Sequence, residues 1–122
     1  MKIETPTLDR LVCNKTRIEL LEHEIDFARS QRKFRNLWQV YEGRMKQLCE
    51  KYEAESEKIL ALLDAIRVEE KGSEVGGAEF LIRHYYDGVP IEDVADEIGY
   101  NDSVMIKKSI IAKKKLEELA QQ

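Results

Sequence analysis

The sequence predicts an all-α protein, in which long N-terminal helices precede a C-terminal three-helix module of helix-turn-helix form. Apolar residues recur at intervals of three and four along most of the chain, which is the period of an amphipathic helix. Only 2 prolines and 6 glycines interrupt the 122 residues, and 36% of them are charged. No apolar run approaches the roughly 18 residues that cross a bilayer, so we expect a cytoplasmic protein without membrane contact.

Two apolar stripes predict the N-terminal helices. The first follows a Thr-Pro-Thr start at residues 5–7 and contains Leu11, Ile18, Leu21, Ile25 and Ala28. The second has the 4-3-4-3 spacing of a coiled-coil seam, and its members are Phe34, Trp38, Tyr41, Met45, Leu48, Tyr52, Glu55, Ile59, Leu62 and Ile66. Ile25 and Phe34 are nine residues apart, which places the stripes on opposite sides of a straight helix. We therefore expect a break or hairpin near residues 29–33; an unbroken helix with different partners on its two faces is the alternative.

The second stripe is long enough that its apolar side chains must be buried against another helix. A homodimer through the seam would bury them, and so would a hairpin with the first stripe of the same chain. The side chains expected to make this contact are Trp38, Tyr41, Met45, Leu48, Tyr52 and Ile59.

A glycine cluster divides the chain. Residues 72–77 contain three glycines and no apolar periodicity, which predicts a flexible linker. The predicted parts are therefore an N-terminal helical region at residues 1–71, the linker at 72–77, and a C-terminal domain at 78–122.

Glycine and proline positions predict three helices in the C-terminal domain. Gly88 suits the end of the first helix and Pro90 the first turn of the second, whose inner stripe is Ile91, Val94, Ala95 and Ile98. Gly99 permits a sharp turn, after which the third helix has the inner stripe Met105, Ser109, Ala112, Leu116 and Leu119. Asn101, Asp102 or Ser103 can cap this third helix.

The C-terminal residues resemble a known family. The spacing Tyr-x-x-Gly-x-x-x-x-x-Val-Ala-x-x-x-Gly-Tyr from Tyr85 to Tyr100, followed by a lysine-rich helix, resembles the fourth region of bacterial sigma factors. Residues 78–119 are more closely similar to phage regulators of the ArpU and RinA type. The resemblance implies transcriptional control through binding of the third helix to double-stranded DNA, with RNA polymerase or another protein as a further partner. The expected DNA contacts are Asn101, Ser103, Lys107, Lys108 and Lys114.

A second hypothesis is a protein-interaction adaptor that keeps the helix-turn-helix shape without DNA affinity. The net charge of −4 and the presence of Asp102 favour it, and Ile106, Ile110 and Ile111 would form its contact surface. We do not expect an enzyme, a cofactor or a metal, since the chain has no glycine-rich phosphate loop, nucleophile elbow or metal-ligand spacing. Cys13 and Cys49 are expected to be reduced thiols.

Overall fold

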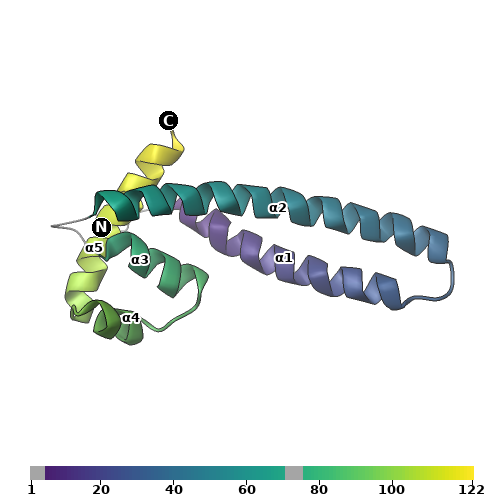
Figure 1. Ribbon diagram of the computed structural model, residues 1–122, viewed down its shortest axis with the longest axis horizontal. Helices are drawn as coiled ribbons and strands as arrows, with labels where there is room; N and C mark the ends of the chain where they lie inside the picture. The colour runs from purple at the N-terminus through teal and green to yellow at the C-terminus, as the bar shows by residue number, and fades with distance from the viewer. Residues whose placement is uncertain (1–4, 71–75) are drawn as a thin grey trace.

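The computed structural model describes residues 5–70 and 76–122, and all of the regular secondary structure in these two ranges is helical. The predicted all-α class is therefore confirmed. The elements are α1 (Pro6–Ser30), α2 (Arg35–Glu69), α3 (Gly77–Leu81), the π-helical turn η1 (Ile82–Tyr86), α4 (Ile91–Ile98) and α5 (Asp102–Ala120). In Figure 1, α1 and α2 extend to one side as an antiparallel pair, while the shorter helices and α5 gather at the other end of α2.

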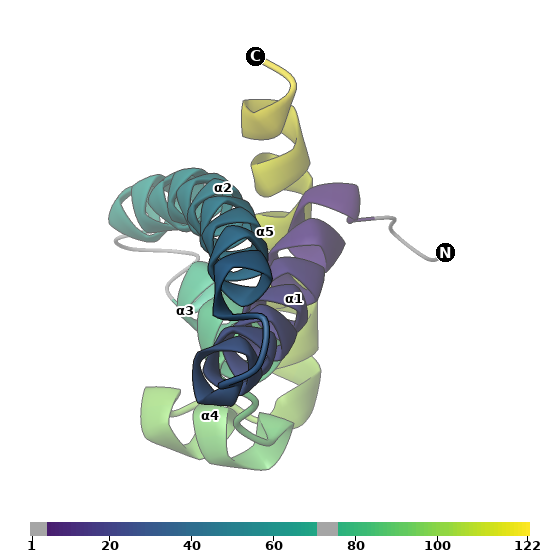
Figure 2. The same cartoon turned by 90° about the vertical axis from the view of Figure 1, so that its right-hand side faces the viewer.

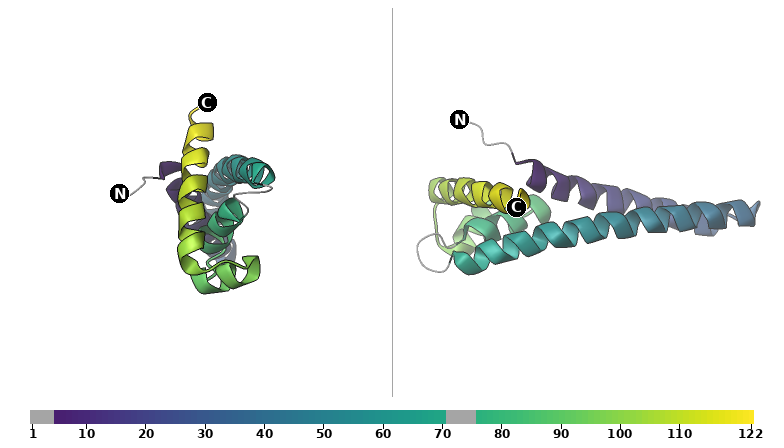
Figure 3. Two further views of the ribbon diagram at one scale, coloured as in Figure 1. Left: turned by 90° about the vertical axis from the view of Figure 1, so that its left-hand side faces the viewer. Right: turned by 90° about the horizontal axis from the view of Figure 1, so that it is seen from above.

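The turn between α1 and α2 lies where the two apolar stripes change sides. Helix α1 ends at Ser30, and Phe34, with a left-handed φ of 55°, precedes the first residue of α2. Across the turn, Nε of Arg29 donates to Oε1 of Glu42 at 2.7 Å. The predicted break near residues 29–33 is thus confirmed as a hairpin, and the alternative of one unbroken helix is wrong. Figure 3 shows the two helices side by side from above.

The seam of the hairpin differs from the predicted one at every second position. The residues of α2 that are buried are Cys49, Ser56, Ile59, Leu63 and Ile66. Cys49 and Ser56 therefore occupy places that the pattern assigned to Leu48 and Glu55. The apolar stripe is wider than the contact line, and the small side chains allow α1 to approach closely, so the larger neighbours remain on the flank.

One hydrophobic core joins the hairpin to the C-terminal helices. It combines side chains from the open end of the hairpin with the inner faces of the other helices: Leu8, Leu11, Ile59, Leu63, Ile66, Ala78, Phe80, Leu81, Val94, Ala95, Met105, Ala112 and Leu116. Figure 2 shows α3 and α5 lying against the α1 and α2 pair. Separate hydrophobic cores for the two predicted parts are not observed among the described residues.

The end of the predicted linker is packed rather than open. Residues 72–75 lie outside the described residues, but Gly76 and Gly77 are buried at the start of α3. Gly76 has a φ of 104°, and both carboxylate oxygens of Glu70 accept the backbone N–H of Ala78, at 2.9 and 3.1 Å. A Cβ on Gly77 would lie 2.8 Å from the carbonyl oxygen of Lys108. Glycine is therefore required here by the close approach of α5.

Candidate nucleic-acid interface

The connection between α4 and α5 is a turn of three residues. Gly99, with a φ of 95°, and Tyr100 both donate their backbone N–H to the carbonyl of Ala95, at 2.8 and 3.0 Å, which closes the end of α4. Asn101 then caps α5, because its Oδ1 accepts the backbone N–H of Val104 at 2.9 Å. Of the three predicted candidates for the cap, Asn101 has this role. In the left view of Figure 3, α4 lies across one end of α5.

Helix α5 has a buried face and an opposite, outward face. Its buried residues are Met105, Ser109, Ala112 and Leu116, as the predicted inner stripe required. At 100° per residue, Ser103, Lys107 and Lys114 fall on the side opposite these four. All three are exposed. The structure therefore brings three of the five predicted DNA-contacting residues onto one surface, which we call the outer face of α5.

The other two predicted contacts serve α5 itself. The side-chain oxygen of Asn101 is occupied by the helix cap. Nζ of Lys108 lies 4.9 Å from the centre of the Tyr100 ring, a cation–π distance, and the side chain is half-buried. Lys113, which follows on α5, donates from Nζ to the hydroxyl of Tyr85 at 2.9 Å. These contacts hold α5 to the turn before it and to η1.

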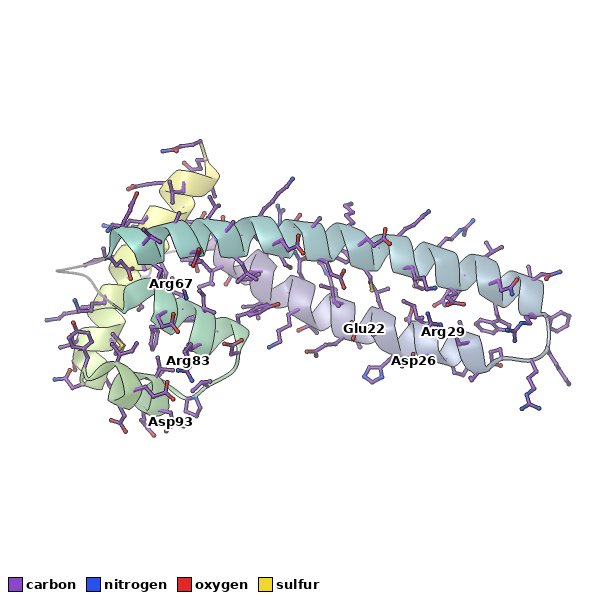
Figure 4. The ribbon with its side chains drawn as sticks, viewed as in Figure 1. Glu22, Asp26, Arg29, Arg67, Arg83 and Asp93 are labelled. Atoms are coloured by element: carbon purple, nitrogen blue, oxygen red, sulfur yellow. The ribbon has the colours of Figure 1, made fainter. Side chains whose placement is uncertain are left out.

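Acidic and basic side chains occupy different parts of the surface around α5. The exposed residues of α4 include four carboxylates, namely Glu92, Asp93, Asp96 and Glu97. Arg83 of η1 forms an ion pair with Glu97, and Figure 4 labels Arg83 and Asp93 at this end of the molecule. Asp102 adds a further exposed carboxylate in the first turn of α5, whereas Lys107 and Lys114 lie farther along the helix. A phosphate backbone would therefore be attracted to the outer face of α5 and repelled by α4.

The adaptor hypothesis predicts an apolar contact surface on α5. Ile106 has 46% of its surface exposed, and Ile110 is half-buried. Ile111, with 39% exposed, lies on the opposite flank from Ile106. Ile106 and Ile110, four residues apart, therefore lie together on one side of the outer face, and Ile111 lies on the other side of it.

The predicted seam residues are divided between the inside and the flank of the hairpin. Ile59 is only 5% exposed and belongs to the core, while Met45 and Tyr52 are half-buried. Trp38, Tyr41 and Leu48 line the flank; Tyr41 and Leu48 are 36% and 37% exposed. The six residues therefore do not form one continuous contact surface, because α1 of the same chain covers the inner ones.

An apolar hollow on this flank was not predicted. It has a volume of about 680 Å³ and is lined by His23, Glu24, Phe27, Phe34, Leu37, Trp38 and Tyr41. We call it the hairpin groove. Phe27 and Leu37 are 57% and 69% exposed. The available signal was the position of Leu20 and Phe27, seven residues apart and both outside the inner stripe of α1.

Comparison with protein-family models, curated proteins and solved structures gives no match for the chain. Within the described residues, no group of three or more His, Cys, Asp or Glu side chains is arranged to hold a metal ion. None of the described helices is long and apolar enough to span a membrane.

Proposed function

We propose that the protein is a DNA-binding transcriptional regulator of the phage or mobile-element type, in which α4 and α5 form a helix-turn-helix and α5 enters the major groove. The observation that carries the proposal is the outer face of α5, where Ser103, Lys107 and Lys114 are exposed opposite the buried stripe. The three-residue turn at Gly99 supports it, since helix-turn-helix motifs join their helices by such a turn. The transcriptional role rests on the resemblance of the spacing from Tyr85 to Tyr100 to that of ArpU and RinA regulators.

The major groove of B-DNA, about 12 Å wide, admits a single α-helix such as α5. Ser103 and Lys114 are separated by about 16 Å along the helix, at 1.5 Å per residue. In this proposal Ser103 and Ile106, near the start of α5, meet base edges, where an apolar side chain can contact a thymine methyl group. Lys107 and Lys114 bind phosphates and set the position of the helix.

DNA binding in this form does not require a dimer. The seam of α2 is already covered by α1 of the same chain, so a second copy is not needed to bury it. A single outer face with two lysines would give weak binding with a modest salt dependence, a slope of log affinity against log salt of about −2. A further protein partner, RNA polymerase among the candidates, would then supply the affinity that the outer face lacks.

The adaptor remains the second candidate, because two observations favour it. Helix α4, which packs against α5, has four exposed carboxylates, and Ile106 is 46% exposed. In the adaptor, α5 would contact a protein through Ile106 and Ile110, and duplex DNA would not bind.

The test measures the binding of labelled duplex DNA over a range of salt concentrations. Replacing Lys107 and Lys114 together by Ala should weaken binding and reduce the slope of log affinity against log salt by about one for each phosphate contact. The matched control replaces Lys51 and Lys58, two exposed lysines of α2, and should leave the slope unchanged. No binding of the unchanged protein at low salt would overturn the DNA proposal and favour the adaptor. If both variants lost the same amount of DNA affinity, α5 would not be the helix that contacts DNA.

A further inference from the structure

The hairpin groove lies at the end of α1 and α2 that is remote from α5. Helix α2 has 35 residues, so its length is about 50 Å at 1.5 Å per residue. Figure 1 shows the turn of the hairpin at one end of the molecule and α4 and α5 at the other. A ligand of the groove would therefore not compete with DNA for space.

Aromatic side chains from both helices form the groove. The ring of Trp38 meets Phe27 and Tyr41 edge to face, at centroid distances of 5.6 and 5.7 Å. The Tyr41 hydroxyl donates to Oε2 of Glu24 at 2.8 Å, which joins α2 to α1 on this flank. Phe34 and Leu37, 75% and 69% exposed, complete the lining. The groove is thus preformed and mainly apolar, and such grooves between two helices bind the apolar side of a third helix.

The chain segment that contains the groove is positively charged. Residues 23–46, which include every residue of the lining, contain six lysines and arginines and three acidic side chains, so their net charge is 6 − 3 = +3, whereas the whole chain has −4. Of the acidic residues, Glu24 lines the groove and Glu42 pairs with Arg29 and Lys46 at 2.7 and 3.1 Å. The basic residues left without an ion pair to a described residue are Arg32, Lys33, Arg35 and Arg44. All four are exposed.

We propose that the hairpin groove binds an amphipathic helix of another protein, whose apolar side chains enter beside Phe27 and Leu37 and whose polar side is acidic. The charge of +3 on residues 23–46 is complementary to such a helix. A second copy is a poorer occupant, because a symmetric contact between two hairpin turns brings two positively charged segments together. A hollow of about 680 Å³ fits inserted side chains better than it fits a flat lipid surface.

The experiment uses the full chain and two series of designed helical peptides without tryptophan. Both series have leucines at heptad a and d positions, one with glutamates and the other with lysines on the polar side. Trp38 is the one tryptophan of the chain and lines the groove, so its emission reports occupancy directly. We expect the glutamate series to bind and to shift the Trp38 emission to shorter wavelength, with an affinity that falls as salt is added. Equal binding of the lysine series, or no binding of the glutamate series, would overturn the proposal.

Variants separate the apolar and the charged parts of the groove. Leu37→Asp should abolish peptide binding, and its matched control, Val68→Asp, changes a residue that is also exposed but lies at the other end of α2. Replacing Arg32 and Arg35 by Glu should weaken binding by about tenfold or more, while the same change at Lys51 and Lys58 should have a small effect. Unchanged circular dichroism spectra check that each variant is folded.

Two further measurements test the other occupants. Phosphatidylserine vesicles that shift the Trp38 emission more strongly than the glutamate peptides do would assign the groove to a membrane surface and overturn the proposal. Sedimentation that shows self-association lost in Leu37→Asp would assign it to a second copy, with the same consequence. A protein that stays monomeric and ignores the vesicles, but binds the glutamate peptides, supports the proposal.

Discussion

The carboxylate of Glu117 accepts two hydrogen bonds from Thr7, one from its backbone N–H at 2.9 Å and one from its hydroxyl at 3.1 Å, although 110 residues separate them. Thr7 lies in the first turn of α1, where the N-cap residue, Thr5, forms no side-chain cap. The first N–H groups of a helix have no acceptor within the helix and carry partial positive charge. Glu117 therefore caps α1 from α5 and joins the first described helix to the last.

Replacing Glu117 by Ala should lower the free energy of unfolding by about 1 kcal/mol, because both hydrogen bonds and the cap of α1 are lost. Urea denaturation followed by circular dichroism measures the change. Glu118→Ala is the matched control, since Glu118 is the exposed neighbour on the same helix. Equal effects of the two substitutions would show that the cap does not contribute.

Alanine at two glycines of the chain should have opposite effects. Gly43 lies inside α2 with no heavy atom within 4 Å of an added Cβ, so Gly43→Ala should stabilise the protein by about 1 kcal/mol. At Gly77 the same Cβ would lie 2.8 Å from Oε1 of Glu70 and from the backbone oxygen of Lys108. Gly77→Ala should therefore destabilise by about 1 to 3 kcal/mol. Thermal unfolding compares the two, and a shift in the same direction would contradict the close packing of α3 on α5.

Two substitutions of Asn101 can distinguish its role as the cap of α5 from a contact with a DNA base. Asn101→Ala should cost about 1 kcal/mol of stability, whereas Asn101→Asp should keep most of the cap, since a carboxylate also accepts the Val104 N–H. If Asn101 also read a base, Asp would change the preferred DNA site while leaving stability intact. Thermal unfolding and site selection on the same two variants separate these roles.

The two cysteines should react at very different rates. Cys49 is 7% exposed, and burial, followed by the negative charges of Glu53, Glu22 and Glu50, raises the pKa of its thiol. A raised pKa reduces the thiolate fraction at a given pH, and the thiolate is the reactive form. Near neutral pH, iodoacetamide should therefore modify the exposed Cys13 first and Cys49 only after denaturation.

Mass spectrometry of partly modified protein measures the two rates. Cys13→Ser should remove the fast reaction, and Cys49→Ser should leave it. Fast modification of Cys49 in the native protein would mean that the hairpin opens readily near its middle.

Local patterns of the sequence predicted several of the turns between helices, but not the π-helical turn η1 after α3 or the start of α3 at Gly77. The opposite placement of Ile25 and Phe34 predicted the hairpin turn, which the structure has between Ser30 and Arg35. Gly88 and Gly99 were predicted at turns, and their φ values of 76° and 95° agree with that role. Helical periodicity and the backbone preference of glycine depend on residues within a few positions of each other, so turns of this kind can be predicted from a single sequence.

Contacts between distant helices were decided by the tertiary structure alone. Leu48 is more apolar than Cys49, yet Cys49 is buried, because the approach of α1 selects the smaller side chain. Glu55 interrupts the apolar stripe, and its Oε1 accepts a hydrogen bond from the side-chain amide of Asn14 on α1 at 2.8 Å. The exposed rings of the hairpin groove and the outer face of α5 likewise follow from which sides the neighbouring helices cover. The sequence by itself determined the helical class, the hairpin turn and the apolar stripes; packing determined which apolar side remained open, since that depends on partners far away along the chain.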